Sequence, residues 1–311
     1  MVISRRDLFL AGSALAIAAV ATTRSTALAQ DAPTPNEPKK TEPAPNALHS
    51  PKGWARSVMS EGDIRLEVFQ KGEGPVVLMH PSLGRSAQDF EDLGNRVAAA
   101  GYRVVLINPR GIGSSTGPME NATLRDLGAD VWMIADALKI DRAFALGQNF
   151  GNRVSRTVSS LQPDRVIGLM LLACGGEIEP DNETWAEFRR VFDFSLPPER
   201  HLKAVANSFF APGNDASVWK DGWNAKTAEQ QAEAAKRTDF KPLYNGGTAP
   251  TLVIQGLNDK IAPPQNAFNF VTRRPNARLA AFPNMGHAML PEQPGPLADV
   301  VINFLKDQPT R

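Results

Sequence analysis

The chain has 311 residues, of which 42% are hydrophobic, and its 34 basic and 33 acidic residues give a net charge of +1. This length fits one large globular domain with terminal extensions. A nearly neutral chain without a basic stripe gives no reason to expect nucleic acid or an anionic membrane surface as a partner. Cys174 is the only cysteine, which excludes an intramolecular disulfide and a cysteine metal cluster. We expect Cys174 to be a buried apolar residue at the end of a strand.

The first 29 residues have the organisation of an export signal. Arg5 and Arg6 precede an apolar run over residues 11–21, and Ala27-Leu28-Ala29 offers small residues at a cleavage point. The run is short for a membrane span, and the paired arginines resemble the twin-arginine signal with which bacteria export folded proteins. We therefore expect a periplasmic or secreted protein with no stable membrane insertion after signal cleavage. An uncleaved membrane anchor is the alternative.

Residues 30–53 are rich in proline, mixed with Lys, Glu, Asn and Thr. Such a composition buries too little apolar surface to offset the entropy lost on ordering. We interpret this segment as a flexible linker. The folded domain is then expected over residues 54–311.

Short apolar runs alternate with helical patterns from Trp54 onward. Runs of this kind are typical of strands that are buried on both faces of a parallel sheet. Such strands are predicted at residues 76–79, 104–107, 143–146, 166–172, 251–254 and 279–282. Residues 64–69 alternate between apolar and polar side chains, which predicts a half-buried strand. Alternation of strands and helices predicts an α/β fold with a mostly parallel, doubly wound sheet.

Two of the predicted helices begin with the pattern of a capping box, in which a Ser or Thr is followed three residues later by an acidic or amide side chain. The first pattern is Ser86 with Asp89, and the second is Thr123 with Asp126. Residues 177–248 interrupt the strand–helix alternation, because they are helical and rich in aromatic side chains. We expect this segment to be a cap inserted after the strand at 166–172, with aromatic side chains that pack against one another.

The segment Gly147-Gln148-Asn149-Phe150-Gly151 follows an apolar strand and opens a helix. It resembles the nucleophile elbow, G-x-S-x-G, of the α/β-hydrolase superfamily. The elbow residue lies at a strained turn between strand and helix, and side chains in place of Gly147 and Gly151 would clash with neighbouring elements.

Other segments follow in the order that this superfamily has, and the resemblance covers roughly residues 54–311. They are His80–Gly84 after a strand, the segment Asn108–Ser115 that is similar to D-x-R-G-x-G-x-S, Gln255–Asp259 after a strand, and Asn284–His287 after the last predicted strand. The resemblance implies an α/β-hydrolase fold with a helical cap insertion, and a nucleophile, an acid and a histidine in that order along the chain.

The resemblance also implies roles for single residues. Asp259 would orient the imidazole of His287, which acts as the base. The oxyanion hole would consist of the backbone N–H groups of Phe150 and of Ser82, because Pro81 has no N–H to donate. We expect structural roles for His80 and for Asn108.

Asn149 is the departure from the pattern, because the elbow normally carries Ser, Asp or Cys. An amide has no readily removed proton and is a poor nucleophile. Asn does tolerate a positive φ angle better than most residues, so we expect the strained turn to be retained.

The sequence therefore leaves several functions open. The first is an atypical hydrolase of a small ester, lactone, epoxide or halide, in which His287 activates water or in which Asn149 deamidates to a carboxylate, a reaction that the bulk of Phe150 slows. The second is a catalytically inactive protein that binds a small molecule, and the third is a cofactor-free lyase or oxygenase that uses the His287–Asp259 base. No segment has the spacing of a nucleotide-binding loop or of metal ligands, so we expect no cofactor and no metal. The oligomeric state is not specified by any pattern.

Overall fold

The computed structural model describes residues 51–309. The chain divides into residues 1–41 and 42–311, and all of the structure below belongs to the second unit. The signal peptide expected at residues 1–29 lies outside the described residues, as does most of the linker expected at 30–53.

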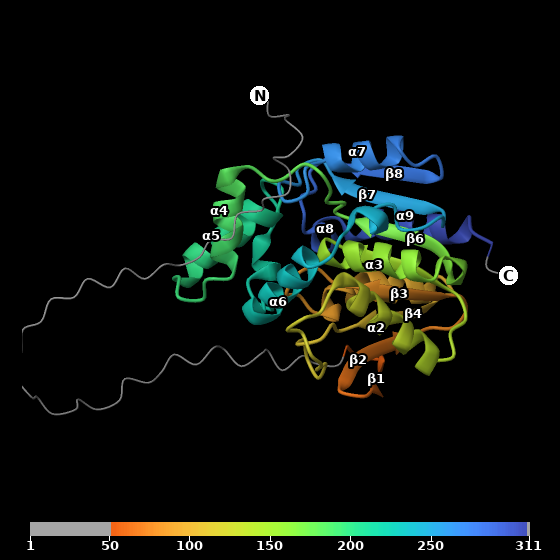
Figure 1. The fold of residues 1–311 in the computed structure, drawn as a ribbon. Helices are drawn as coiled ribbons and strands as arrows, with labels where there is room; N and C mark the ends of the chain where they lie inside the picture. The colour runs from red at the N-terminus through yellow and green to blue at the C-terminus, as the bar shows by residue number, and fades with distance from the viewer. Residues whose placement is uncertain (1–50, 310–311) are drawn as a thin grey trace, which may run out of the picture. The chain divides into compact units, whose positions relative to one another are not determined.

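One eight-stranded sheet forms the centre of the unit, with strand order β1-β2-β4-β3-β5-β6-β7-β8 (Figure 1). β2 is antiparallel to β1 and to β4, and all pairs from β4 to β8 are parallel. The strands are β1 (Ala55–Glu61), β2 (Ile64–Lys71), β3 (Val76–His80), β4 (Arg103–Ile107), β5 (Ala143–Gln148), β6 (Val166–Leu172), β7 (Thr251–Gly256) and β8 (Ala277–Phe282). The predicted α/β fold with a mostly parallel, doubly wound sheet is confirmed.

Two strands differ from the sequence prediction. β1 was not predicted, because its polar side chains are largely exposed at the edge of the sheet and give no apolar run. β8 was predicted to be buried on both faces, which is wrong. It is the opposite edge strand, and none of its residues is fully buried.

Helices cover both faces of the sheet (Figure 1). On one face, α2 (Leu124–Ala137), α3 (Phe150–Leu161) and α7 (Gln265–Thr272) contribute to one apolar core. On the other face, α1 (Glu91–Ala99) and α9 (Pro294–Lys306) pack beside one another over a second core. Three short segments complete this part of the fold: η1 (Ala87–Phe90), η2 (Pro163–Arg165) and α8 (Met289–Glu292). None of the helices within residues 51–309 is long and apolar enough to cross a membrane.

The two predicted capping boxes have different outcomes. The box of Thr123 and Asp126 at the start of α2 is confirmed, with both reciprocal hydrogen bonds present. The box of Ser86 and Asp89 is wrong, because the Ser86 side chain makes no capping hydrogen bond and α1 begins only at Glu91. The N–H of Ala87 donates instead to Oδ1 of Asn108 at 2.8 Å. The side chain at the end of a neighbouring strand thus takes the place of a local cap.

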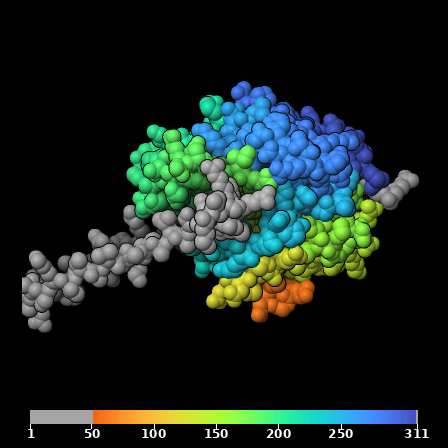
Figure 2. All heavy atoms as spheres, turned by 45° about the horizontal axis from the view of Figure 1, so that its top comes forward, coloured from red at the N-terminus to blue at the C-terminus, as the bar shows by residue number. Residues whose placement is uncertain are grey.

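The segment between β6 and β7 contains α4 (Asn182–Val191), α5 (Pro198–Phe209), η3 (Ala216–Trp219), α6 (Ala225–Lys236) and η4 (Lys241–Leu243). α4, α5 and α6 gather beyond one end of the sheet (Figure 1), and the green residues of α4 and α5 form a lobe in the space-filling view (Figure 2). Aromatic side chains of this segment pack on one another in a separate apolar cluster. We refer to residues 177–248 as the cap.

Hydrogen bonds fix the cap to loops at the carboxyl ends of β3 and β4. The N–H of Gly84 donates to the side chain of Gln231 at 2.8 Å, and its carbonyl accepts from the N–H of Asn224 at 3.0 Å. Thr227 donates to the carbonyl of Gly111 at 3.0 Å. The cap therefore lies over the carboxyl ends of these parallel strands, which is the end of the sheet at which the predicted site residues are placed.

Candidate active site

The elbow residue has the backbone conformation that the sequence suggested. β5 ends at Gln148, α3 begins at Phe150, and Asn149 between them has φ 51° and ψ −111°. The predicted positive φ is confirmed. The N–H of Asn149 donates to the carbonyl of Leu172 at 3.0 Å, which ties the turn to the end of the neighbouring strand β6.

The two glycines of the elbow are required by close backbone contacts. A Cβ atom on Gly147 would lie 2.0 Å from the carbonyl oxygen of Gly151. A Cβ atom on Gly151 would lie 2.1 Å from the carbonyl oxygen of His80 and 2.6 Å from that of Pro81. The predicted clashes are confirmed, and the first turn of α3 therefore packs directly on the backbone that follows β3.

Asp259 and His287 come together from loops that follow two neighbouring strands, β7 and β8. Nδ1 of His287 lies 2.9 Å from both carboxylate oxygens of Asp259. The exposed fraction is 3% for Asp259 and 0% for His287. A proton on Nδ1 that donates to the carboxylate leaves Nε2 as the nitrogen that can accept a proton. Nε2 is buried and has no hydrogen-bond partner within residues 51–309.

The backbone of His287 is held by the cap and by the elbow strand. Its N–H donates to the carbonyl of Phe209 in the cap at 2.7 Å. Its carbonyl accepts from the side chain of Gln148 at 2.9 Å. Because Gln148 directly precedes Asn149, this hydrogen bond joins the elbow to the histidine loop. The ring of Phe209 also lies against the imidazole, with centroids 5.6 Å apart.

The carboxylate of Asp259 has a defined orientation. Its Oδ1 accepts from the N–H of Ala262 at 2.7 Å, and its Oδ2 accepts from the side chain of Gln255 at 3.3 Å. Gln255 also accepts from the N–H of Cys174 at 3.2 Å and so connects Asp259 to the end of β6. These contacts restrict rotation of the carboxylate, which in turn orients the imidazole of His287.

The backbone N–H groups of Ser82 and Phe150 are the predicted oxyanion hole. Neither group has a protein acceptor within the part of the chain that the structure describes. The loop that carries Ser82 follows His80 and Pro81, on whose carbonyls Gly151 packs. Two free N–H groups that point at one oxygen stabilise its negative charge, and this role for Ser82 and Phe150 stays a prediction.

His80 and Cys174 have surroundings that suit structural roles. His80 is buried, and burial lowers its pKa from 6.5 to about 4, so that the ring is neutral at pH 7. Cys174 is buried after the end of β6, as predicted, and its sulfur accepts from Nη2 of Arg156 at 2.8 Å. Burial raises the pKa of the thiol above its usual value in spite of the nearby guanidinium, which makes it a poor nucleophile.

Glu292 is a further residue of the site, and the sequence analysis missed it. Its Oε2 accepts from the N–H of Gly286 at 2.7 Å, next to His287. Its Oε1 accepts from the N–H of Ala211 and from the side chain of Asn214 in the cap, each at 2.7 Å. Burial raises the pKa of this carboxyl group. Gln148 and Gln255 were also missed as support residues. All three lie within five positions of a predicted site residue, and that proximity was the only available signal.

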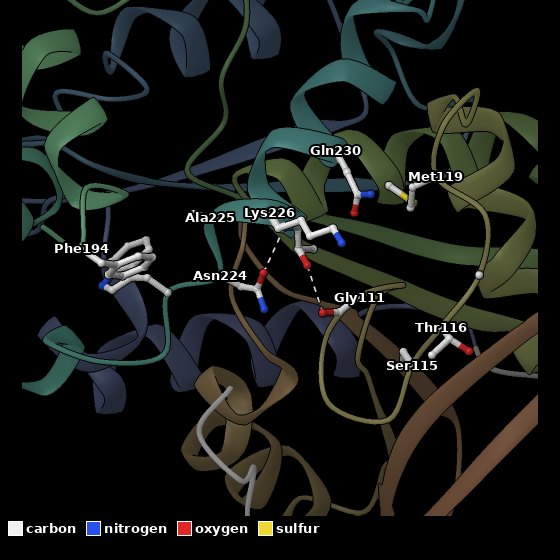
Figure 3. Close-up of a pocket in the computed structure, with 12 residues that line it drawn as sticks. Gly111, Ser115, Thr116, Met119, Phe194, Asn224, Ala225, Lys226 and Gln230 are labelled. Atoms are coloured by element: carbon white, nitrogen blue, oxygen red, sulfur yellow. Dashed lines mark hydrogen bonds between the residues drawn. The ribbon is translucent and has the colours of Figure 1, made fainter. Parts of the chain in front are cut away.

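A separate cavity of about 360 Å³ lies between α6 and the loop after β4. Figure 3 shows Lys226 and Gln230 of α6 on one side, the loop with Gly111 and Met119 on another, and Phe194 of the cap farther away. Asn149, Asp259 and His287 do not line this cavity, so it is not the site of their chemistry. Within residues 51–309 no group of three or more His, Cys, Asp or Glu side chains is arranged to hold a metal ion.

Comparisons with known proteins agree with this architecture. Residues 75–200 match the family model of the alpha/beta hydrolase fold. The 2-hydroxy-6-oxononadienedioate/2-hydroxy-6-oxononatrienedioate hydrolase 1 of Pseudomonas putida is 26% identical over 270 residues, which cover 79% of this chain and 94% of the relative. The non-heme chloroperoxidase of Streptomyces lividans is 25% identical over 265 residues, which cover 77% of this chain and 96% of the relative.

Solved structures with a similar fold include those of hydrolases. An esterase from Exiguobacterium antarcticum superposes with a TM-score of 0.68 at 20% identity, over 78% of this chain and 96% of that one. A thermophilic esterase from Thermogutta terrifontis superposes with a TM-score of 0.67 at 21% identity, over 81% of this chain and 98% of that one. The eight-stranded sheet, the matched family model and these similarities show that the chain has the α/β-hydrolase fold.

Proposed function

We propose that this chain is a hydrolase of a small ester, lactone, epoxide or halide, in which His287 acts as general base and Asp259 orients it. One observation supports the proposal above the others. The imidazole is buried, its Nδ1 lies 2.9 Å from both oxygens of Asp259, and its Nε2 has no partner within residues 51–309. A buried ring nitrogen without a hydrogen-bond partner costs free energy, which is expected at a reactive site rather than in a purely structural histidine.

The proposed reaction for an ester or lactone starts with water. Nε2 of His287 takes a proton from the water as its oxygen attacks the carbonyl carbon, and Asp259 stabilises the imidazolium. The N–H groups of Ser82 and Phe150 hold the oxygen that becomes negative. The tetrahedral intermediate then collapses, the bond to the leaving oxygen breaks, and His287 returns the proton to that oxygen. Asn149 itself loses no proton in this scheme.

A specific observation supports a second candidate, a protein that binds a small molecule without turnover. The residue at the strained turn is Asn149, whose amide is a poor nucleophile although its φ of 51° matches an elbow. A cofactor-free lyase or oxygenase that uses the His287–Asp259 base is a variant of the catalytic proposal. Relatives of this chain carry the names of a hydrolase and of a chloroperoxidase, and the shared fold alone does not choose between such activities.

The proposal is tested by assaying the purified protein on nitrophenyl esters, lactones, epoxides and haloalkanes. We expect hydrolysis of at least one class, and we expect His287→Ala to lower its rate about 10²- to 10⁴-fold. His201→Ala is the matched control, because His201 lies in α5 of the cap and its Nε2 contacts the carbonyl of Val191 at 2.9 Å. Activity that appears only after Asn149→Ser would contradict the proposal and support the binding protein.

We also propose that the chain is exported through its twin-arginine signal and acts in the periplasm or outside the cell. Arg5 and Arg6, the apolar run over residues 11–21 and the small residues before Gln30 support this. A folded α/β hydrolase without a disulfide is suited to a route that carries folded proteins.

A further inference from the structure

We propose that Asn149 is a site of self-modification, at which the fold converts the asparagine to an aspartate. The backbone nitrogen of Phe150 attacks Cγ of Asn149, the bond from Cγ to the amide nitrogen breaks, and ammonia leaves. Water then opens the resulting succinimide ring at Cγ and leaves a carboxylate. The net change is the addition of one water and the loss of one ammonia. The consequence of this change for catalysis rests on the proposed hydrolase function. In such a hydrolase the new carboxylate would supply the nucleophile that the elbow lacks.

The backbone angle at Asn149 is close to the one that ring closure requires. The five-membered ring can form only when Cβ and the following nitrogen are eclipsed about the Cα–C bond, which for an L-residue means a ψ of about −120°. Asn149 has a ψ of −111°. Ordinary helical or extended residues have to rotate far from their energy minimum to reach this angle. The elbow therefore holds Asn149 in a conformation that a flexible chain visits rarely.

The attacking nitrogen is also free to react. Phe150 is the first residue of α3, and its N–H has no acceptor within the part of the chain that the structure describes. Its position at the amino end of a helix of 12 residues favours the negative charge that develops when the proton leaves. The Phe150 N–H is thus neither held by a carbonyl nor in a position that opposes its ionisation.

The same site offers a base and removes the usual effect of a bulky neighbour. The carbonyl of His287 accepts a hydrogen bond from the side chain of Gln148, the residue before Asn149, and Nε2 of His287 has no partner within residues 51–309. We assign Nε2 as the base that takes the proton of the Phe150 N–H. In a flexible peptide the bulk of Phe150 slows ring closure by hindering the approach of its nitrogen. Here the ring of Phe150 is buried in the core and ψ of Asn149 is already fixed, so the Cα–C bond does not have to rotate and only a turn about χ1 brings Cγ to the nitrogen.

Asn152 is an internal control on the same segment. It lies within α3, and its side-chain nitrogen donates to the carbonyls of Leu172 at 3.2 Å and Ala173 at 2.8 Å. Its helical backbone does not eclipse Cβ with the next nitrogen. Both asparagines lie on one tryptic peptide, residues 143–153, so that they are compared in a single measurement.

The experiment follows this peptide by mass spectrometry while the folded protein is incubated at pH 8. We expect a gain of about 1 Da at Asn149, a transient species lighter by about 17 Da, and no change at Asn152. The synthetic peptide of residues 143–153 should react at least about tenfold more slowly, because it lacks the fixed ψ angle. A folded protein that reacts no faster than the peptide, or that reacts equally at Asn152, overturns the inference.

A second measurement separates this inference from the proposed function. Turnover is measured on Asn149→Asp and on Asn149→Gln, whose longer side chain does not form the five-membered ring. Modification of the native protein, without turnover by either the native protein or Asn149→Asp, refutes the hydrolase and leaves the self-modification standing. Turnover by Asn149→Gln, when Asn149 of the native protein shows no modification, refutes the self-modification and leaves the hydrolase standing.

Discussion

At the scale of single residues, the contacts of the elbow are the tightest in the site. Gly151 touches the backbone carbonyls of His80 and Pro81, so that neither neighbour can move aside as a flexible side chain would. This contact sets the distance between α3 and the loop that carries Ser82. The geometry of the proposed oxyanion site therefore requires a glycine at position 151, whose side chain is a single hydrogen atom.

Replacement of this glycine is expected to destabilise the protein. Gly151→Ala forces a Cβ atom against two backbone carbonyls, and we expect a loss of more than about 3 kcal/mol in the free energy of unfolding. Gly295→Ala is the matched control, because a Cβ atom there meets no atom within 4 Å. Urea denaturation of both variants measures the difference. Equal stabilities for the two would show that the backbone contact at Gly151 is not restrictive.

His80 is expected to make stability depend on pH. Its pKa falls from 6.5 to about 4 in the folded protein, because burial disfavours the charged ring. The unfolded chain therefore binds the proton first, and the stability is present above pH 6.5 and is lost as the pH falls towards 4. Between pH 7.5 and 4.5 we expect this residue to account for about 2 to 3 kcal/mol of the loss. The unfolding free energy of His80→Asn should decrease less over this range, and a decrease equal to that of the native protein would contradict the assignment.

At the scale of elements, the cap and the histidine loop are joined by one carboxylate. Glu292 in α8 accepts from Gly286 on the loop and from Ala211 and Asn214 in the cap. The carbonyl of Phe209 adds a bond to the N–H of His287. We therefore expect movement of the cap to displace the backbone that carries the proposed base.

Loss of this carboxylate is expected to loosen both segments together. Glu292→Gln replaces an acceptor oxygen by an NH₂ group that faces an N–H donor, and such a mismatch costs about 1 to 3 kcal/mol. Hydrogen exchange at Gly286 and Ala211 should become at least about tenfold faster. Glu233→Gln, which removes a surface pair with Lys236 in α6, is the control and should leave both rates unchanged. Faster exchange at only one of the two amides would contradict the coupling.

At the scale of the whole molecule, the sheet could be predicted because apolar runs report burial directly. β1 could not, because its exposed side chains resemble a loop. The elbow, Asp259 and His287 each had a local motif, whereas the contacts of Glu292 with Ala211 and Asn214 join segments about 80 residues apart. The capping box predicted at Ser86 is wrong for the same reason. The side chain that accepts from the N–H of Ala87 is that of Asn108, which follows β4. Local spacing carries no information about such contacts.

The proposed export signal is tested on the intact chain in a bacterial host. Replacement of both Arg5 and Arg6 by Lys should retain the protein in the cytoplasm, because the paired arginines are the element that the export route reads. The native protein should reach the periplasm with Gln30 at its amino terminus, as amino-terminal sequencing would establish. Equal export of both proteins would contradict the twin-arginine assignment.

The orientation of the imidazole by Asp259 is the centre of the proposed mechanism, and Asp259→Asn tests it most directly. The amide is equal in size but presents an NH₂ group to Nδ1, so that the proton moves to Nε2 and the base is lost. We predict that hydrolysis of the best substrate in the panel falls about 10³- to 10⁴-fold, while the protein stays folded by circular dichroism. Unchanged hydrolysis by the folded variant would show that the pair is structural and that the activity lies elsewhere.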